Sequence, residues 1–293
     1  MHPFFSIIIP TYNRAAMIEL AINSILTQTF QDFEILVVDD GSKDDTESII
    51  KNIPDKRIKY FKKINEERSI ARNFGIKKAE GSYINFLDSD DKFYPHHLET
   101  AYQLLSKNNF PEIGHLGYEM IDGKGNVLLQ RADFSDNIEE SMLEENILHG
   151  NAIFIRRSIA IQYPFINDKN AVVSEDWYVW MRLIARYKVF YDNTITSAII
   201  EHGERSLRNI NPDKLIASTE LIIENLKRDQ VFITKHGRKV NAFFSNQYTL
   251  VTLVLSITKQ RRLDTIKYLL KALRFDYTVI FRRRFLASIK HWF

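Results

Sequence analysis

The first 90 residues alternate between continuous apolar runs and apolar residues at helical spacing. The continuous, β-rich runs predict strands buried on both faces, at residues 4–9, 34–38, 58–61 and 83–87. The helical spacing predicts helices at 15–28 and 69–78, and Ser42 with Asp45 predicts a capped helix start that runs to residue 52. Repeated β-α-β units of this kind predict an α/β fold, a mostly parallel sheet with helices on both faces.

The rest of the chain has weaker patterns. They predict helices at 95–106 and 177–187 and strands at 127–129 and 153–155. Glu175 and Asp176 precede the second of these helices, where negative charge suits the positive end of the helix dipole. From about residue 212 onward the pattern is all helical.

Polar residues follow three of the predicted strands where each strand ends, at 10–14, 39–40 and 88–91. In parallel sheets ligands bind beyond the carboxyl ends of the strands. Acidic side chains gathered there repel one another unless a cation or a hydrogen-bonding ligand lies between them. The sequence therefore predicts a ligand site at this edge of the sheet.

The acidic residues of this edge have two readings. Asp88 and Asp90 can together hold Mg²⁺ or Mn²⁺, which prefer oxygen ligands and are usually held by one or two carboxylates plus substrate phosphates. Taken alone, the same spacing is more typical of solvated turn acids, a role that also fits Asp91. Asp39 and Asp40 fit either hydrogen-bond acceptors for a nucleobase or ribose, or an ordinary turn.

Composition excludes several classes of protein. The chain has 293 residues, of which 45% are hydrophobic and 26% charged, as in globular proteins, and the lack of cysteine excludes disulfides, thiolate nucleophiles and cysteine-ligated zinc. No dinucleotide-binding or P-loop glycine motif occurs, which argues against a Rossmann dehydrogenase and a P-loop NTPase. The apolar stretch 250–257 is far shorter than the roughly 20 residues that span a bilayer, and no basic leader occurs, so we expect a cytoplasmic protein.

The net charge of +3 conceals a division along the chain. Residues 1–209 carry 24 Lys and Arg against 31 Asp and Glu, whereas residues 210–293 carry 16 against 6. In residues 259–293, apolar and aromatic residues recur at helical spacing among ten Lys and Arg, as in segments that bind anionic membrane surfaces peripherally. A helical hairpin packed on the body, or on a second subunit of a homo-oligomer, fits as well. We expect no nucleic-acid partner, because the body is acidic.

Four motifs follow one another in the chain: 6–14 (SIIIPTYNR), 37–42 (VVDDGS), 71–75 (ARNFG) and 86–91 (FLDSDD). Together they resemble the ordered motif set of the family 2 glycosyltransferases, which have the GT-A fold. The resemblance is dense over the first 100 residues and continues thinly through 175–177 and His202. It implies transfer of a sugar from a nucleotide diphosphate donor.

The resemblance also implies roles for single residues. The nucleotide-sugar would be bound by Thr11, Tyr12, Arg14, Asp39, Asp40, Arg72, Asp88 and Ser89. Within this set, Tyr12 would lie against the base, Asp39 would accept a hydrogen bond from the base with Asp40 as its substitute, and Asp88 would face the ribose. Arg14 also fits a solvated turn residue.

The remaining implied roles concern the metal and the chemistry. Asp90 and His202 would bind the Mn²⁺ or Mg²⁺ that bridges the diphosphate, Asp176 would be the catalytic base, and Glu175 and Trp177 would contact the acceptor. Such a transfer needs a cation on the leaving diphosphate and a base for the acceptor hydroxyl, and a single base implies inversion. Without the resemblance, Asp176 fits a helix cap and Trp177 a core residue.

We therefore predict a GT-A domain over 1–210, with a nucleotide-sugar-binding half (1–91) and an acceptor-binding half (92–210), followed by a basic helical extension (211–293). The predicted activity is metal-dependent, inverting transfer from a UDP-sugar to a glycan or lipid-linked acceptor in cell-surface polysaccharide synthesis. A polyprenyl-phosphate sugar transferase and a catalytically silent nucleotide-sugar-binding subunit are the alternatives. One departure leaves the donor sugar open: the family often has glycine in the loop where this chain has Glu67 and Arg68.

Overall fold

The computed structural model describes residues 2–202, 211–258 and 261–292, and these form two compact units. The first unit comprises 2–138, 147–169 and 187–202 and contains the sheet. The second comprises 139–146, 170–186 and the described residues from 211 onward, and it is helical. The domain boundary expected at residue 210 stays a prediction.

The strands of the first unit form one mixed sheet of nine strands in the order β3-β2-β1-β4-β8-β6-β9-β5, with β7 paired to β6. Their bounds are β1 (Phe5–Thr11), β2 (Phe33–Asp39), β3 (Ile58–Lys62), β4 (Tyr83–Phe86), β5 (Lys92–Phe93), β6 (Ile113–Asp122), β7 (Val127–Arg131), β8 (Ile153–Arg156) and β9 (Val189–Glu201). The strands β3, β2, β1 and β4 are parallel, as predicted. Because β8 runs antiparallel to both β4 and β6, the other half of the sheet is mixed.

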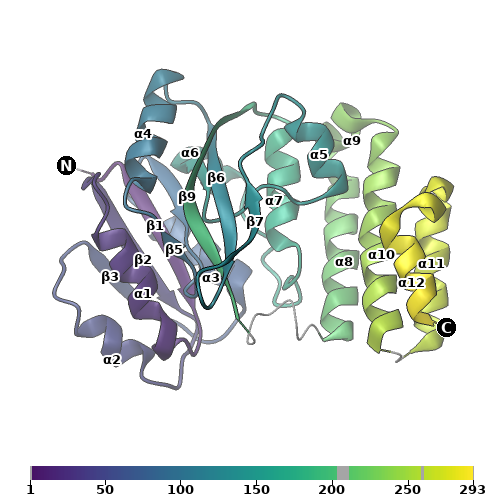
Figure 1. The fold of residues 1–293 in the computed structure, drawn as a ribbon, viewed down its shortest axis with the longest axis horizontal. Coiled ribbons are helices and arrows are strands. Elements are labelled where there is room, and N and C mark those ends of the chain that lie inside the picture. Colours follow the sequence, from purple (N-terminus) through teal and green to yellow (C-terminus); the bar gives the residue numbers. More distant parts are fainter. Residues whose placement is uncertain (1, 203–210, 259–260, 293) are drawn as a thin grey trace. The chain divides into compact units, whose positions relative to one another are not determined.

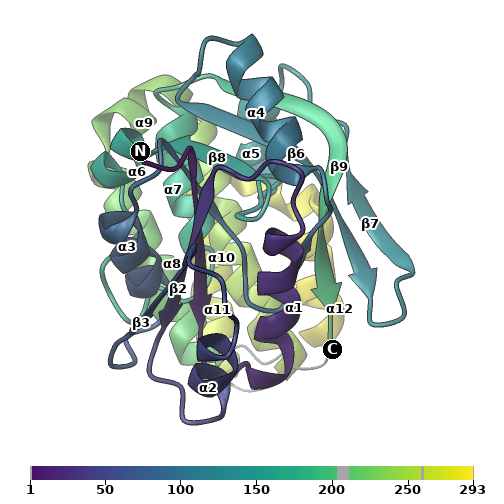
Figure 2. The same ribbon diagram turned by 90° about the vertical axis from the view of Figure 1, so that its left-hand side faces the viewer.

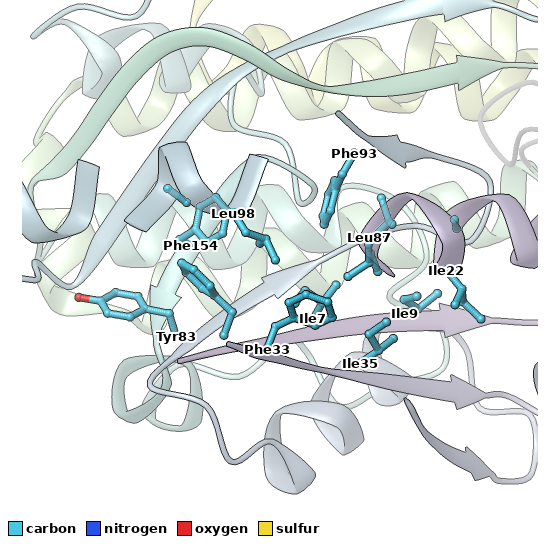
Figure 3. Packing of buried hydrophobic residues seen from close by; sticks show 14 of the residues in the cluster. Ile7, Ile9, Ile22, Phe33, Ile35, Tyr83, Leu87, Phe93, Leu98 and Phe154 are labelled. Atoms are coloured by element: carbon cyan, nitrogen blue, oxygen red, sulfur yellow. The ribbon is translucent and has the colours of Figure 1, made fainter. Parts of the chain in front are cut away.

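Helices cover both faces of the parallel half. The helices of this unit are α1 (Ala15–Leu26), α2 (Thr46–Lys51), α3 (Arg68–Lys78), α4 (His97–Lys107) and α6 (Arg157–Gln162). Side chains alternate between the faces of a strand, so Ile7 and Ile9 of β1 join Ile22 of α1 in one buried cluster (Figure 3). Ile8 meets the opposite helix, since a Cβ at Gly75 of α3 would lie 2.5 Å from its Cγ2. Figure 2 shows α1 and α3 on opposite sides of these strands.

The sequence pattern did not predict the long strands β6 and β9. β6 contains buried polar side chains, among them His115 and Glu119, which interrupt the apolar run expected of a buried strand. The pairing of the two strands shifts register on either side of Gly117, where a Cβ would lie 2.8 Å from the carbonyl oxygens of Asn193 and Thr194. The irregular pairing therefore depends on glycine and on local contacts that have no simple period in the sequence.

The predicted capping box at Ser42 is wrong. Helix α2 begins at Thr46, and its N-cap residue, Asp45, makes no side-chain capping bond. The Thr46 N–H donates to Asp44 Oδ1 instead, and the hydroxyl of Ser42 accepts the N–H of Asn13 at 2.9 Å. Ser42 thus ties the loop after β2 to the loop after β1.

The second unit is made of helices around α10. Its elements are most of α5 (Ile138–Glu144), α7 (Glu175–Ile184), α8 (Pro212–Arg228), α9 (Gln230–His236), α10 (Lys239–Thr258), α11 (Arg262–Phe275), the 3-10 helix η1 (Tyr277–Phe281) and α12 (Arg283–Trp292). Helices α8, α11 and α12 each pack against α10, in the green to yellow part of Figure 1. Asn211 caps α8 by accepting the N–H groups of Asp213 and Lys214. Among the described residues, no helix is long and apolar enough to cross a membrane.

Candidate active site

The loops that follow β1 and β2 lie together at the carboxyl edge of the parallel strands. Asn13, which has a positive φ of 52°, accepts the N–H of Lys43 at 2.9 Å and donates its own N–H to Ser42. Within this edge, Thr11 is buried and its hydroxyl has no hydrogen-bond partner among the described residues, whereas 43% of Tyr12 is exposed. Of the two residues expected to line the nucleotide pocket, Tyr12 therefore exposes part of its side chain, whereas the unpartnered hydroxyl of Thr11 is buried.

Asp39 is fully buried at the end of β2 and is held by two donors. The Ser42 N–H donates to its Oδ1 at 2.7 Å, and the hydroxyl of Tyr60 in β3 donates to its Oδ2 at 2.6 Å. Burial and the bond to Asp39 raise the pKa of Tyr60, so this hydroxyl keeps its proton. Each carboxylate oxygen has a second lone pair, which leaves Asp39 able to accept from a ligand.

Asp40 organises the loop before α3. Its carboxylate lies 2.7 Å from Lys63 Nζ and accepts the backbone N–H groups of Glu66 and Glu67. Glu67, in the loop where a glycine was expected from the resemblance, has φ 77° and ψ 163°, a conformation that residues with a Cβ rarely adopt. Asp40 therefore stabilises a turn that is strained at Glu67.

Asp88 lies among positive charges at the end of β4. Arg72 Nη2 of α3 is 2.7 Å from its Oδ1, and Arg68 Nη1 is 3.9 Å from its Oδ2. Burial disfavours the charged form of Asp88, but Arg72, Arg68 and His149 outweigh burial and lower its pKa below the usual value. The guanidinium of Arg72 also lies 5.3 Å from the ring centre of Phe165. Asp88 is thus a fixed carboxylate.

Asp90 and His202 meet at the same edge, although 112 residues separate them in sequence. His202 Nε2 is 2.9 Å from Asp90 Oδ2, and Arg14 Nη2 lies 3.9 Å from the same oxygen. Asp91, next in the chain, accepts the N–H of Ile200 at 3.0 Å and so fastens the end of β9 to this loop. The interpretation of Asp91 as a solvated turn residue is wrong, because its side chain is buried and positions His202 beside Asp90.

A second group of potential metal ligands lies beside this pair. Asp88, Asp91 and His149 place one ligand atom each within 4.8 Å of one another, and within the described part of the chain no other group of three or more such residues does so. His149 follows α5 on an irregular segment, where no motif pointed to it. The edge therefore contains carboxylate and imidazole groups suited to a divalent cation.

The three predicted residues at 175–177 lie on α7, in the second unit. Glu175 is buried, and Asp176 Oδ1 accepts the N–H of Trp177 at 2.7 Å. Trp177 is buried as well, and its indole N–H donates to the carbonyl of Met142 at 2.8 Å. Trp177 is therefore a core residue of its unit, and the base role of Asp176 and the acceptor contacts of Glu175 and Trp177 stay predictions.

Known proteins similar to this chain show which family it belongs to. The family model described as glycosyl transferase family 2 matches residues 6–178, more than half of the chain. The chain belongs to glycosyltransferase family 2. An uncharacterized glycosyltransferase of Rickettsia bellii is 34% identical over 227 residues, which cover 75% of this chain and 32% of that relative. The family 2 match includes the four motifs and residues 175–177, whereas His202 lies beyond it.

A named relative of this family 2 glycosyltransferase is the Campylobacter jejuni GalNAc(5)-diNAcBac-PP-undecaprenol beta-1,3-glucosyltransferase. It is 40% identical over 129 residues, which cover 43% of this chain and 41% of that enzyme. The chain thus spans less than half the length of either of these two relatives.

Two solved structures show the fold of this family 2 glycosyltransferase. Staphylococcus aureus TarS 1–349 in complex with UDP-GlcNAc has a TM-score of 0.75 at 20% identity, and the match covers 99% of this chain and 88% of the TarS 1–349 chain. Mannosyltransferase PcManGT from Pyrobaculum calidifontis, in complex with GDP-Man and Mn²⁺, has a TM-score of 0.57 at 17% identity, covering all of this chain and 87% of that one. The GT-A fold with a helical C-terminal region, predicted from the sequence, is therefore confirmed.

The structure brings most of the predicted residues of the first unit to one edge. Arg72 with Asp88, and Asp90 with His202 and Arg14, are in direct contact, and Ser89 is buried between the two aspartates in the chain. Tyr60, Asp91 and His149 were missed as site residues. Tyr60 and His149 lie outside the four motifs, and Asp91 ends the motif 86–91 but was interpreted as a solvated turn residue. Their positions follow from strand pairing and loop contacts, which only the folded chain shows.

Proposed function

We propose that this glycosyltransferase moves a sugar from UDP to a hydroxyl group of a glycan or lipid-linked acceptor, with a divalent cation and with inversion at the anomeric carbon. The observation that carries the proposal is the contact of Asp90 with His202 beside the Asp88–Arg72 pair, at the carboxyl edge of the parallel strands. This edge combines groups for a cation with positive charge for an anionic donor, and both are needed where a nucleotide diphosphate binds.

The residues at this edge suit a metal ion. His202 Nε2 faces Asp90, and the other ring nitrogen, Nδ1, is buried without a hydrogen-bond partner among the described residues. An imidazole and a carboxylate are ligands that Mn²⁺ accepts, and diphosphate oxygens commonly complete such sites. We propose that Asp90 and His202 hold Mn²⁺ or Mg²⁺. When bound, the cation supplies positive charge to the departing diphosphate.

Other residues of the edge would bind and orient the donor. The exposed ring of Tyr12 is suited to lie against the base, and the unpartnered hydroxyl of Thr11 can bond to the nucleoside. Asp39, held in place by Ser42 and Tyr60, would accept a hydrogen bond from the base. Asp88 would face the ribose, and Arg72 and Arg68 beside it would offset the negative charge that the donor brings.

The transfer step needs a base, and Asp176 of α7 matches the family position for it. The acceptor hydroxyl gives its proton to the Asp176 carboxylate while its oxygen forms a bond to the anomeric carbon. The bond from that carbon to the diphosphate oxygen breaks, and both electrons go to the leaving oxygen. With attack opposite the leaving group, the anomeric centre inverts.

The similar proteins support the choice of donor and acceptor. A TarS structure contains UDP-GlcNAc, and the Campylobacter relative is named for an undecaprenol-linked acceptor. We therefore propose a UDP-sugar donor, an acceptor that is a glycan or lipid-linked, and a place at the inner face of the membrane in cell-surface polysaccharide synthesis. The cation seen in PcManGT, Mn²⁺, is the first to test.

Turnover of UDP-sugars tests this function. We expect the protein with Mn²⁺ to release UDP slowly from its donor without an acceptor, and faster with the correct acceptor. Asp176→Asn should keep donor binding but lose transfer, whereas Asp90→Ala should lose metal-dependent binding. Asp32→Asn, a change at an exposed aspartate just before β2 and so at the opposite end of that strand, is the matched control and should leave both unchanged.

Three results would contradict the proposal. Binding of UDP-sugars without any turnover would indicate a silent binding subunit. Turnover only with polyprenyl phosphate would indicate the alternative transferase. Normal transfer by Asp176→Asn would exclude the proposed base.

A further inference from the structure

Helix α11 presents an apolar row to solvent rather than to the core. Leu263, Ile266 and Leu270 lie three and four residues apart, on one side of the helix, and Leu263 is 83% and Leu270 59% exposed. The side that packs inward carries Thr265, Tyr268 and Ala272, all buried. The usual distribution of residues on a surface helix is therefore reversed for Leu263 and Leu270.

The exposed aromatic residues of η1 follow directly after α11. Tyr277 is 76% and Phe281 80% exposed, whereas Val279 between them is fully buried. Val279 anchors the turn, and the two rings point away from the packed side. The row on α11 and these two rings together form what we call the C-terminal face, defined by Leu263, Ile266, Leu270, Tyr277 and Phe281.

Cations border the apolar row. A shallow hollow on the surface of α11 is lined by Leu263, Ile266, Leu270, Lys267, Lys271 and Arg274. Lys271 pairs with Glu220, but within the described part of the chain Lys267 and Arg274 form no ion pair. Of the two acidic residues nearby, Asp276 lies 3.7 Å from Arg282, and Asp264 lies 4.0 Å from Arg261, which also pairs with Asp213, so the two cations Lys267 and Arg274 outnumber the one acid whose partner is shared. The face thus carries uncompensated positive charge beside exposed apolar side chains.

We propose that the C-terminal face binds the surface of an anionic lipid bilayer. Apolar side chains that enter the acyl boundary and cations that remain at the headgroups are the two contributions that hold peripheral segments on such membranes. Lys and Arg side chains are long enough to keep their charge in the headgroup layer while their stems lie beside the leucines. The proposal goes beyond the transfer reaction and does not depend on it.

The same observations argue against two other partners for the C-terminal face, the rest of this chain and a second copy of it. The exposure of Leu263, Leu270, Tyr277 and Phe281 shows that the described protein does not cover this face. A second copy bound through the same face in a two-fold dimer would place Lys267 and Arg274 against their own positive charges, which is unfavourable. An anionic bilayer matches both the charge and the apolar row.

Sedimentation of the full chain with vesicles tests the proposal. The probes are vesicles of phosphatidylcholine alone and vesicles with 30% phosphatidylglycerol, about 1 in 3 lipids being anionic. We expect binding to the anionic vesicles only, and weaker binding as salt shortens the range of the attraction. Lys267→Gln/Arg274→Gln should weaken binding about 30-fold, since each cation at the surface is worth a factor of about five. Leu263→Gln/Leu270→Gln should weaken it at least about ten-fold.

A matched control variant shows whether exposed leucine and lysine residues elsewhere on the surface contribute to vesicle binding. Leu20→Gln/Lys107→Gln replaces one exposed leucine and one exposed lysine in the first unit and should bind vesicles like the unchanged protein. The exposed positions should tolerate substitution, and unchanged melting temperatures show that each variant is folded. UDP release is measured on the same variants, so that failure of the membrane proposal is distinguished from failure of the transfer reaction.

Three outcomes would overturn the proposal. The first is no binding of the unchanged protein to anionic vesicles. The second is equal binding by both double variants and the control. The third is a concentration-dependent dimer that the same two double variants abolish, because the face would then be an interface between copies of this chain.

Discussion

Glu67 provides a stability test of the loop beside Asp40. Its φ of 77° and ψ of 163° lie in a region that is essentially restricted to glycine, where other residues are strained by about 1 to 3 kcal/mol. Glycine at this position removes the strain but loses about 0.5 to 1 kcal/mol to the greater freedom of the unfolded chain. The free energy of unfolding of Glu67→Gly should therefore be about 1 kcal/mol higher than that of Glu67→Ala.

The comparison of the two variants isolates the effect of the backbone conformation at residue 67 on stability. Both remove the Glu67 carboxylate, and both keep the N–H that donates to Asp40 at 2.8 Å, so they differ only in the Cβ. For a chain of 293 residues, about 1 kcal/mol corresponds to roughly 2 °C in melting temperature, which differential scanning calorimetry resolves. Urea unfolding followed by circular dichroism, which reports the backbone of both units, gives the free energy independently.

Glu66 is the matched control for this prediction. It is the preceding residue, it also donates its N–H to Asp40, and its φ is not positive. Here Glu66→Gly should be less stable than Glu66→Ala by about 0.5 to 1 kcal/mol. Glycine is thus the less stable choice at residue 66 and the more stable choice at residue 67. If Glu67→Ala is as stable as Glu67→Gly or more stable, the strain at Glu67 does not exist and the reasoning fails.

Two further predictions concern the core of the first unit. Gly75→Ala should destabilise the protein by about 1 to 3 kcal/mol, because its Cβ would overlap a β1 side chain, whereas Gly123→Ala, with open space around it, should be close to neutral in the same urea unfolding assay. Burial lowers the pKa of His97 to about 3 and that of His115 to about 3, so below pH 6.5 the unfolded chain binds protons that the folded chain does not. The free energy of unfolding should therefore fall by about 2 kcal/mol for each of these histidines when the pH is lowered from 7 to 5. If the free energy of unfolding of His97→Asn depends on pH as steeply as that of the unchanged protein, this prediction is wrong.

The parallel half of the sheet could be predicted because local pattern and final structure agree there. The continuous apolar run of β1 is buried on both sides, as such runs indicate, and the polar residues after β1, β2 and β4 lie at one edge. The pattern failed at β6 and β9, where His115 and Glu119 are buried and the register shifts at Gly117. β6 and β9 form because they pair with strands that are distant in sequence. Such pairing produces no regular spacing of apolar residues from which the strands could be predicted.

The residues of the candidate site differ in the same way, since local pattern predicted some of them and contacts between distant segments decided the others. Asp88 and Asp90 could be found from their position after a strand, but His202 was singled out only by resemblance to the family, since β9 was not predicted. Asp91 was taken for a solvated residue because its bond to Ile200 joins segments 109 residues apart. Contacts of this range depend on the folded chain, so spacing in the sequence cannot show them.

Calorimetric titration of UDP with and without Mn²⁺ tests the central claim most directly, that the carboxyl edge of the sheet is a metal-dependent site for a nucleotide diphosphate. Mn²⁺ should strengthen UDP binding in the unchanged protein and in Asp32→Asn, and Asp90→Ala and His202→Ala should each remove this gain. UDP affinity that is the same with Mn²⁺ and with a chelator, or a gain from Mn²⁺ that survives in both Asp90→Ala and His202→Ala, would contradict it.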